Sequence, residues 1–279
     1  MMTDQEDISV VEPRPAQPEA LVERRHGSRE EMRCQILGVN FFTGIAQEAV
    51  DKMRDGGLLV VPAAPALIEI GTNAAYREAL LSADLVIPDS GYMVLIWNLI
   101  GKPRIPRLSG LEYLRVLLMQ SDARAFGNTF WIMAGEHSAA VNLKWLREQG
   151  IGVRAESVYN APMYGKGRLE DPVLLALIEE QKPQHIIVTI GGGNQERIGL
   201  YLRRALSYKP AIHCIGAAIA FLSGDQVHVP RWADKFAMGW LLRILSHPKR
   251  YAPRYWHARK LLGILLRYRS QLPPFTGGK

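Results

Sequence analysis

Short apolar runs rich in Val, Ile and Leu alternate along the chain with helical patterns of apolar and polar positions. This alternation is typical of βαβ units around a largely parallel sheet. The apolar runs predict strands at 35–39, 58–62, 84–88, 129–135, 153–158, 185–191 and 212–217. The helical patterns predict helices near 44–54, 75–81, 92–100, 111–120, 138–149, 172–181 and 196–206. We therefore expect a Rossmann-like α/β fold with helices on both faces of the sheet.

The two ends of the chain depart from this pattern. Residues 1–33 are rich in Pro, Glu and Arg and lack the basic start and apolar stretch of a secretory signal, which predicts a disordered lead-in. We expect the α/β domain to cover 34–230 and a helical appendage to cover 231–279. No window of about 18 uncharged apolar residues occurs, which argues against a membrane-spanning helix.

The appendage is basic and aromatic. Between Arg231 and Arg269 the only acidic residue is Asp234, whereas basic residues recur among Trp, Tyr and Leu. Because the whole chain has a net charge of +7, this stretch accounts for its basic character. An interfacial helix uses such a mixture to bury one face in a membrane and to pair with anionic headgroups. A core-packing helix with a solvated basic face is the alternative, and nucleic-acid binding is disfavoured by the aliphatic content.

Composition excludes several classes of site. Cys34 and Cys214 lie far apart without CxxC spacing, so neither a zinc site nor a disulfide framework is predicted, and a reducing cytosol is expected. The seven histidines show no metal-ligand spacing. We therefore predict neither a metal nor a cofactor. With 48% hydrophobic residues, the 279-residue chain can bury a sizeable core.

Three loops are candidates for ligand binding because they follow predicted strands, and ligands of such sheets bind outside the carboxyl ends of the strands. The loops are PDSG (88–91), AGEHS (134–138) and IGGGNQE (190–196). In the first loop, Asp89 interrupts an apolar stretch at the point where the chain must turn. Asp89 is either a general base that accepts a proton from an attacking hydroxyl or a cap of the following helix.

The glycine-rich loop contains Gly191, Gly192 and Gly193, followed by Gln195 and Glu196. Its backbone N–H groups suit a phosphate or diphosphate at a helix N-terminus, although a plain tight turn has the same pattern. It lacks the G-x-G-x-x-G fingerprint, which disfavours an NAD-dependent oxidoreductase. Gln195 and Glu196 could bind a base or sugar hydroxyls, and Glu196 could equally be a first-turn acid.

The chain from about residue 36 to residue 255 resembles the WecG/TagA/CpsF glycosyltransferases, glycosyltransferase family 26. The segments that carry the resemblance are YREALLSADLVIPDSG, RLSGLEYL, VTIGGGNQERI, IGAAIAFLSGDQVHVPRW and MGWLLRILSHPKRYAPRYW. The resemblance implies an inverting transferase that moves a sugar, usually from a UDP-linked donor, to a polyprenyl-diphosphate-linked sugar at the cytoplasmic face of the membrane.

Residue roles follow from the resemblance by position. Asp89 matches the family's general base, and Gln195 and Glu196 match its donor-site pair. The family's C-terminal arginines, thought to complete the active site at the membrane, match Arg243, Arg250 and Arg254. The expected partners are a nucleotide-sugar donor, the lipid-linked acceptor and an anionic membrane surface, with no nucleic acid and with a homo-oligomer left open.

The sequence also departs from the family. Members usually carry Thr-x-Asn after the second strand, where this chain has Pro62, Ala63 and Ala64, and an acidic position of the family is Ala220 here. Two functions are therefore weighed. The first is a transferase in exopolysaccharide or other surface-glycan assembly, and the second is a homologue that binds sugar nucleotide or membrane without catalysis.

Overall fold

The computed structural model describes residues 32–165, 167, 169–226 and 256–277. The compact unit that they form begins at Arg33. The predicted lead-in and the predicted boundary between 230 and 231 fall almost entirely outside the described residues, so both stay predictions. None of the described helices combines the length and the apolar character needed to cross a membrane.

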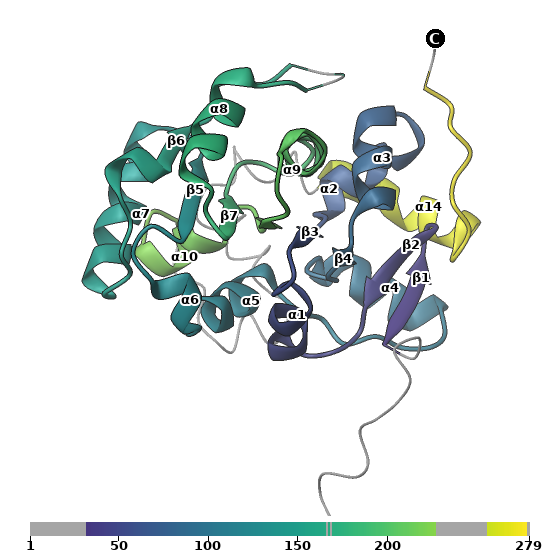
Figure 1. Cartoon of the computed structure of the whole chain (residues 1–279). Helices are drawn as coiled ribbons and strands as arrows, with labels where there is room; N and C mark the ends of the chain where they lie inside the picture. The colour runs from purple at the N-terminus through teal and green to yellow at the C-terminus, as the bar shows by residue number, and fades with distance from the viewer. Residues whose placement is uncertain (1–31, 166, 168, 227–255, 278–279) are drawn as a thin grey trace, which may run out of the picture. The chain divides into compact units, whose positions relative to one another are not determined.

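One eight-stranded sheet has the order β1-β2-β4-β3-β8-β7-β5-β6 (Figure 1). β1 and β2 pair antiparallel, and every other neighbouring pair in this sheet is parallel. This confirms the predicted, largely parallel α/β architecture. The strands are β1 (Arg33–Ile36), β2 (Val39–Phe42), β3 (Gly57–Val60), β4 (Leu85–Val86), β5 (Thr129–Met133), β6 (Val158–Asn160), β7 (His185–Val188) and β8 (Ala211–Cys214).

Most predicted helices are confirmed to within a few residues. They are α1 (Ala46–Lys52), α3 (Ala74–Ser82), α4 (Gly91–Ile100), α5 (Gly110–Leu117), α7 (Glu136–Glu148), α8 (Pro172–Gln181) and α9 (Asn194–Ala205). The sequence analysis missed four short helices, α2 (Ala64–Leu67), η2 (Ile68–Gly71), α6 (Ser121–Arg124) and α10 (Ala218–Ser223), because one turn of helix is too short to show periodicity. A further helix, α14 (Lys260–Tyr268), lies in the predicted appendage.

Two predicted strands are wrong. The run 35–39 is two strands, because Leu37 and Gly38 form a two-residue turn with φ of 53° and 77° between β1 and β2. Positive φ at both central residues matches the twist of a hairpin. The run 153–158 contributes only its last residue to β6, and Ala155–Ser157 (η3) form a 3₁₀ turn instead.

Consecutive residues of β8 show how helices cover both faces of the sheet. His213 contacts the Tyr113 hydroxyl of α5, whereas the Cys214 thiol donates to the carbonyl oxygen of Gln195 in α9. Neighbouring side chains in a strand point to opposite faces, so α5 and α9 lie on opposite sides. α9 approaches closely because a Cβ atom at Gly199 would be 2.5 Å from the Cys214 sulfur.

The C-terminal segment packs on the α/β unit. The backbone N–H groups of Leu37 and Gly38 donate to the carbonyl oxygens of Arg269 and Ser270, at 2.7 and 2.8 Å. Figure 1 shows the yellow α14 beside the purple β1–β2 hairpin. Further along, the Arg77 guanidinium donates to the Pro273 carbonyl oxygen at 2.6 Å. Residues 256–277 of the predicted appendage are therefore attached to the domain by backbone hydrogen bonds and by α14.

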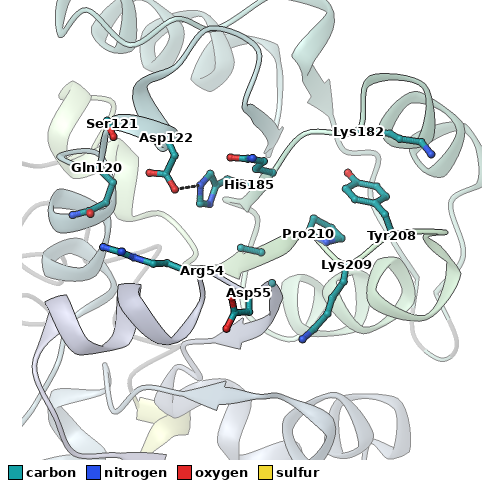
Figure 2. A pocket seen from close by; sticks show the side chains of 13 residues that line it. Arg54, Asp55, Gln120, Ser121, Asp122, Lys182, His185, Tyr208, Lys209 and Pro210 are labelled. Carbon is teal, nitrogen blue, oxygen red and sulfur yellow. Dashed lines mark hydrogen bonds and ion pairs between the residues drawn. The ribbon is translucent and has the colours of Figure 1, made fainter.

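A cavity of about 680 Å³ lies at the amino-terminal edge of the sheet, where β3, β7 and β8 begin (Figure 2). Arg54, Lys182 and Lys209 line it together with Asp122 and His185. Ligands of open α/β sheets bind at the carboxyl edge, so this cavity is on the opposite side from the expected reaction. Two residues of its wall, Asp122 and His185, are one end of a chain of hydrogen-bonded side chains that continues into the interior.

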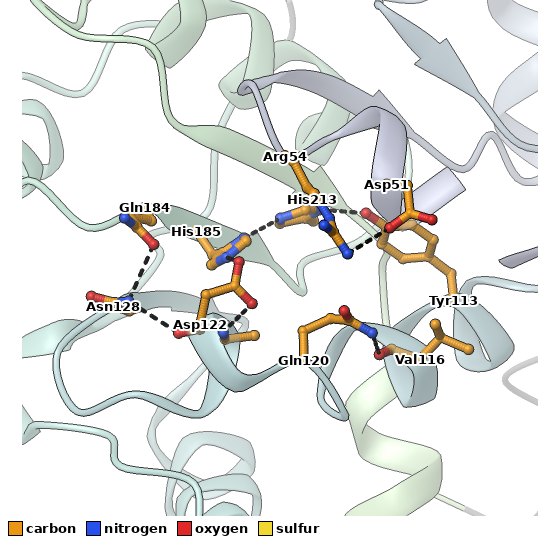
Figure 3. A network of polar contacts seen from close by, with 11 residues as sticks. Asp51, Arg54, Tyr113, Val116, Gln120, Asp122, Asn128, Gln184, His185 and His213 are labelled. Carbon is orange, nitrogen blue, oxygen red and sulfur yellow. Dashed lines mark hydrogen bonds and ion pairs between the residues drawn. The ribbon is translucent and has the colours of Figure 1, made fainter. Parts of the chain in front are cut away.

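That chain runs from Tyr113 through His213 and His185 to Asp122, with contacts of 2.8, 3.1 and 3.3 Å (Figure 3). The Asp122 carboxylate accepts, so His185 Nε2 carries the hydrogen. A neutral His185 then accepts at Nδ1 from His213 Nε2, and His213 Nδ1 accepts from the Tyr113 hydroxyl. One arrangement of hydrogens thus satisfies every contact and joins α5, β8, β7 and α6.

We predict that the two histidines make the fold sensitive to acid. Burial lowers the pKa of His213 well below its ordinary value, with the nearby His185 as a second cause, and burial also lowers the pKa of His185. Because the unfolded chain takes up these protons near pH 6.5 and the folded chain does not, stability falls as pH drops below about 6.5. His213→Asn should cost about 1–3 kcal/mol at pH 7.5.

The difference in stability between wild type and His213→Asn should shrink at pH 5, because the variant no longer holds that imidazole neutral. Chemical denaturation at pH 7.5 and pH 5 measures both differences. His137→Asn, at an exposed position, is the matched control and should match wild type at both values. An equal cost of His213→Asn at the two pH values would contradict the buried, neutral state.

Candidate active site

Backbone pairing aligns the carboxyl ends of four neighbouring strands. Val60 of β3 lies opposite Val86 of β4 and Cys214 of β8. Cys214 in turn lies opposite Val188 of β7. The chain leaves the sheet beyond these positions in loops that contain Ala63, Asp89, Ala217 and Gly191. Two of the predicted ligand loops, those of Asp89 and of the glycines, are therefore at one edge.

Gly110, the first residue of α5, connects these loops. Its backbone N–H donates to Asp89 Oδ1 at 3.0 Å. A Cβ atom at Gly110 would lie 3.3 Å from the Ile215 carbonyl oxygen and 3.6 Å from Val61 Cγ2. The start of α5 thus contacts the ends of β3 and β8 and the loop after β4, and the absence of a side chain permits this approach. The third predicted loop, 134–138, follows β5, which is separated from β8 by β7.

Asp89 is not the cap of the helix that follows it. Ser90 is the N-cap of α4, and its hydroxyl accepts from the Met93 backbone N–H at 3.2 Å. The capping alternative of the sequence analysis is therefore wrong for α4. The Asp89 side chain is 32% exposed, so a carboxylate at the ligand edge of the sheet is still accessible to solvent.

Arg107 fixes the Asp89 loop from the other side. Its Nε donates to the Asp89 carbonyl oxygen at 2.7 Å, and one terminal nitrogen lies 3.5 Å from Asp89 Oδ1. Sequence reasoning gave Arg107 no role, although it is the first residue of the RLSGLEYL segment that carries the resemblance. Because Arg107 contacts both the carbonyl oxygen and the carboxylate of Asp89, Arg107 is a candidate positioning residue.

The glycine-rich loop separates β7 from α9 and has a left-handed residue at its end. Gly193 has φ of 92°, and Cβ atoms at Gly191 and Gly193 would meet no neighbouring atom within 4 Å. A Cβ atom at Gly192 would lie 3.7 Å from the Cβ atoms of Ala63 and Ala66. The VPAAPAL segment, where the family usually carries polar residues, therefore lies directly against this loop.

Glu196 is enclosed by that loop. It has no exposed surface and accepts from the Gly193 backbone N–H at 2.6 Å and from Gln195 Nε2 at 3.1 Å. Burial raises the pKa of Glu196 to about 7, against the opposing effect of these hydrogen bonds. The amide of Gly193 is thus occupied by Glu196, and this one N–H is not available to a phosphate in the described arrangement.

Two buried polar atoms near Glu196 have no hydrogen-bond partner among the described residues. They are the Gln195 Oε1 atom and the Tyr76 hydroxyl. Burial raises the pKa of Tyr76 well above its ordinary value, and the negative charges of Glu196 and Glu69 raise it further. Because buried polar atoms are normally paired, Gln195 and Tyr76 are the described groups with an unmet capacity to bind a ligand or water.

Arg197 ties the loop to its surroundings. Its guanidinium donates to the carbonyl oxygens of Gly165 and Gly167 and to the Asn194 side chain, and Nε donates to the Gly193 carbonyl oxygen. Since Arg197 is itself buried, these contacts satisfy a charge that would otherwise be costly. Sequence reasoning missed this role because the partners Gly165 and Gly167 are about 30 residues away in the sequence.

Other predicted groups fall elsewhere. Arg243, Arg250 and Arg254 lie outside the described residues, so their roles stay predictions. Within the part of the chain that the structure describes, no group of three His, Cys, Asp or Glu side chains could hold a metal ion. Cys34 and Cys214 are buried free thiols, and Ala220 is buried in α10.

Comparison with known sequences agrees with this arrangement. The model of the glycosyl transferase WecG/TagA/CpsF family matches residues 34–273. The chain belongs to this family of glycosyltransferases. The match includes the loops of Asp89 and Glu196 and extends through α14, so α14 lies within the family region. The predicted enzyme class is thereby confirmed.

Two curated relatives carry the same name, N-acetylglucosaminyldiphosphoundecaprenol N-acetyl-beta-D-mannosaminyltransferase. The protein of Bacillus spizizenii (strain ATCC 23059 / NRRL B-14472 / W23) is 25% identical over 227 residues, which are 80% of this chain and 85% of the relative. The protein of Staphylococcus aureus (strain MRSA252) is 22% identical over 226 residues, 78% of this chain and 86% of the relative.

We predict that Glu196→Gln changes how the stability of this family member depends on pH. The pKa of Glu196 is raised to about 7 from 4.5, so the folded state retains a proton that the unfolded state releases. Wild type therefore loses stability as pH rises from about 4.5 to 7, and the variant lacks this loss. Glu196→Gln should gain roughly 1–3 kcal/mol relative to wild type between pH 5 and pH 8.

Denaturation at pH 5 and pH 8 measures this gain. Glu136→Gln is the control, because Glu136 is exposed at the start of α7, and its stability relative to wild type should not change with pH. A constant difference between Glu196→Gln and wild type at both pH values would show that Glu196 is already ionised at pH 5.

Proposed function

We propose that the chain is an inverting glycosyltransferase that moves a sugar from a nucleoside-diphosphate donor, UDP in the first instance, to a polyprenyl-diphosphate-linked sugar. The observation that carries this proposal is the accessible Asp89 carboxylate at the carboxyl edge of the sheet, held by Gly110 and Arg107. Family membership and the names of the two relatives support the reaction class.

In this mechanism Asp89 is the general base. Among the described residues the Gly110 backbone N–H and the Arg107 guanidinium both donate to Asp89 Oδ1, which leaves Oδ2 to accept the proton of the acceptor hydroxyl. The hydroxyl oxygen attacks the anomeric carbon of the donor sugar as the bond to the diphosphate breaks. One displacement inverts the configuration, and the proton stays on Asp89 until it is lost to solvent.

The departing diphosphate needs positive groups. The N-terminus of α9 faces the same edge, and it is a twelve-residue helix with a substantial dipole. Arg243, Arg250 and Arg254 are proposed to complete this site and to contact the acceptor diphosphate. We propose further that Gly191, Gly192 and Gln195 contact the donor, while Glu196 holds the loop from inside.

The donor sugar is proposed from the relatives to be an N-acetylhexosamine, with N-acetylmannosamine as the first to test. The product is a lipid-linked sugar for exopolysaccharide or another surface glycan, made by a peripheral protein at the inner face of the cell membrane. A non-catalytic homologue is the second candidate, because Pro62, Ala63 and Ala64 stand where the family usually carries Thr-x-Asn, and Ala63 lies against the glycine loop.

We predict that Asp89→Asn lowers kcat at least 100-fold, within the usual contribution of a general base. A panel of UDP- and GDP-sugars with an undecaprenyl-diphosphate-linked N-acetylglucosamine acceptor in detergent measures transfer to lipid. Asp55→Asn is the matched control, because Asp55 is an exposed carboxylate at the opposite edge of the sheet. It should keep wild-type turnover.

Transfer that persists in Asp89→Asn would remove Asp89 from the chemistry. Binding of UDP by the wild type, without transfer from any donor in the panel, would favour the non-catalytic homologue. The two results are distinguished by equilibrium dialysis with UDP beside the transfer assay.

A further inference from the structure

Helix α4 begins directly after Asp89 and Ser90 and contains no charged residue, with the sequence GYMVLIWNLI. Met93, Val94, Ile96 and Trp97 are buried in the core. On the outer side, Leu95 is 60% exposed and Leu99 is 77% exposed. Residues four apart share one face of a helix, so α4 presents a leucine pair where an ordinary surface helix has polar residues.

Helix α14 packs against α4 and has a similar arrangement. Leu261 and Leu265 are fully buried, whereas Leu262 is 41% exposed and Leu266 is 49% exposed. Two helices in contact, from distant parts of the sequence, therefore each expose an i, i+4 pair of leucines. Isolated exposed leucines are common on protein surfaces, whereas a contiguous apolar patch marks an interaction surface.

Basic residues predominate around these helices, although Asp89 precedes α4 and the exposed Glu69 lies on η2, which contacts α14. Lys102 and Arg104 are exposed in the loop after α4. Exposed basic residues on and beside α14 are Arg259, Lys260, Arg267 and Arg269. Neither 91–111 nor 256–277 contains an acidic residue. An apolar surface bordered mainly by cations is complementary to a layer of acyl chains beneath anionic headgroups.

We propose that α4 and α14 form the membrane-docking face of this chain. The leucine pairs enter the interface between headgroups and acyl chains of an anionic bilayer, and the basic residues contact the headgroup phosphates. This proposal rests on the proposed function in that the lipid-linked acceptor places the reaction at a membrane. Because Asp89 lies two residues before α4 begins, docking of α4 sets the distance of Asp89 from the bilayer.

The test compares Leu95→Gln/Leu99→Gln with wild type in co-sedimentation with vesicles of phosphatidylcholine and phosphatidylglycerol. The double variant should partition at least tenfold more weakly. Met119→Gln/Val173→Gln is the matched control, because these exposed apolar side chains lie after α5 and on α8, and it should bind as wild type does. Equal binding of all three proteins would overturn the proposal.

A charge variant, Lys102→Glu/Arg104→Glu, tests the same surface without altering any buried group. It should lose binding to vesicles that contain phosphatidylglycerol in proportion to the anionic lipid content. Unchanged binding by this variant would contradict the headgroup contacts. If Leu95→Gln/Leu99→Gln instead loses self-association in light scattering but still binds vesicles, the leucines belong to a contact between copies of the chain, and the proposal is overturned.

Comparing a water-soluble acceptor with a membrane-embedded one tests the docking face separately from the proposed function. With a short-chain, water-soluble acceptor, Leu95→Gln/Leu99→Gln should transfer sugar as wild type does, whereas transfer to an acceptor embedded in vesicles should fall about tenfold. If wild type transfers to neither acceptor but the variant still loses vesicle binding, the proposed function fails and the docking face stands.

Discussion

The parallel pairing of β4, β3, β8 and β7 is the constraint on which the candidate site depends. Parallel strands all leave a sheet at the same edge, and the register aligns Val60, Val86, Val188 and Cys214 across it. Segments from distant parts of the sequence therefore arrive together. Gly110 then joins them: its amide donates to Asp89, and the absence of a Cβ atom avoids a tight contact of 3.3 Å with the carbonyl oxygen of Ile215.

Two buried polar systems lie on opposite sides of this sheet and differ in how completely they are paired. The Tyr113–His213–His185–Asp122 chain satisfies all of its ring nitrogens and serves the connection of helices to strands. Around Glu196, by contrast, Gln195 Oε1 and the Tyr76 hydroxyl lack partners among the described residues. Incomplete pairing costs stability, so its occurrence at the glycine-rich loop is consistent with a site that a ligand completes.

Sequence patterns predicted the parts of the fold that depend on long periodic runs. The helices from α1 to α9 of seven residues or more and most strands were found, whereas the Leu37–Gly38 turn was missed because a leucine at positive φ carries no turn signature. The edge location of Asp89 and the glycine loop was also predictable, because each directly follows a predicted strand of a largely parallel sheet. The internal position of Glu196 and the contact of Arg107 with Asp89 were not, because they depend on tertiary distances.

The proposed docking of α4 would link the proposed reaction to the membrane. In the proposed mechanism the general base meets a hydroxyl whose sugar is fixed to a lipid, so the height of the base above the bilayer matters as much as its orientation. Orientation comes from Gly110 and Arg107, which both contact Asp89 Oδ1. The height of Asp89 above the bilayer would be set by α4, the uncharged helix that begins after Ser90. Because a helix is rigid, the depth at which Leu95 and Leu99 enter the bilayer determines the position of Asp89 just before the helix.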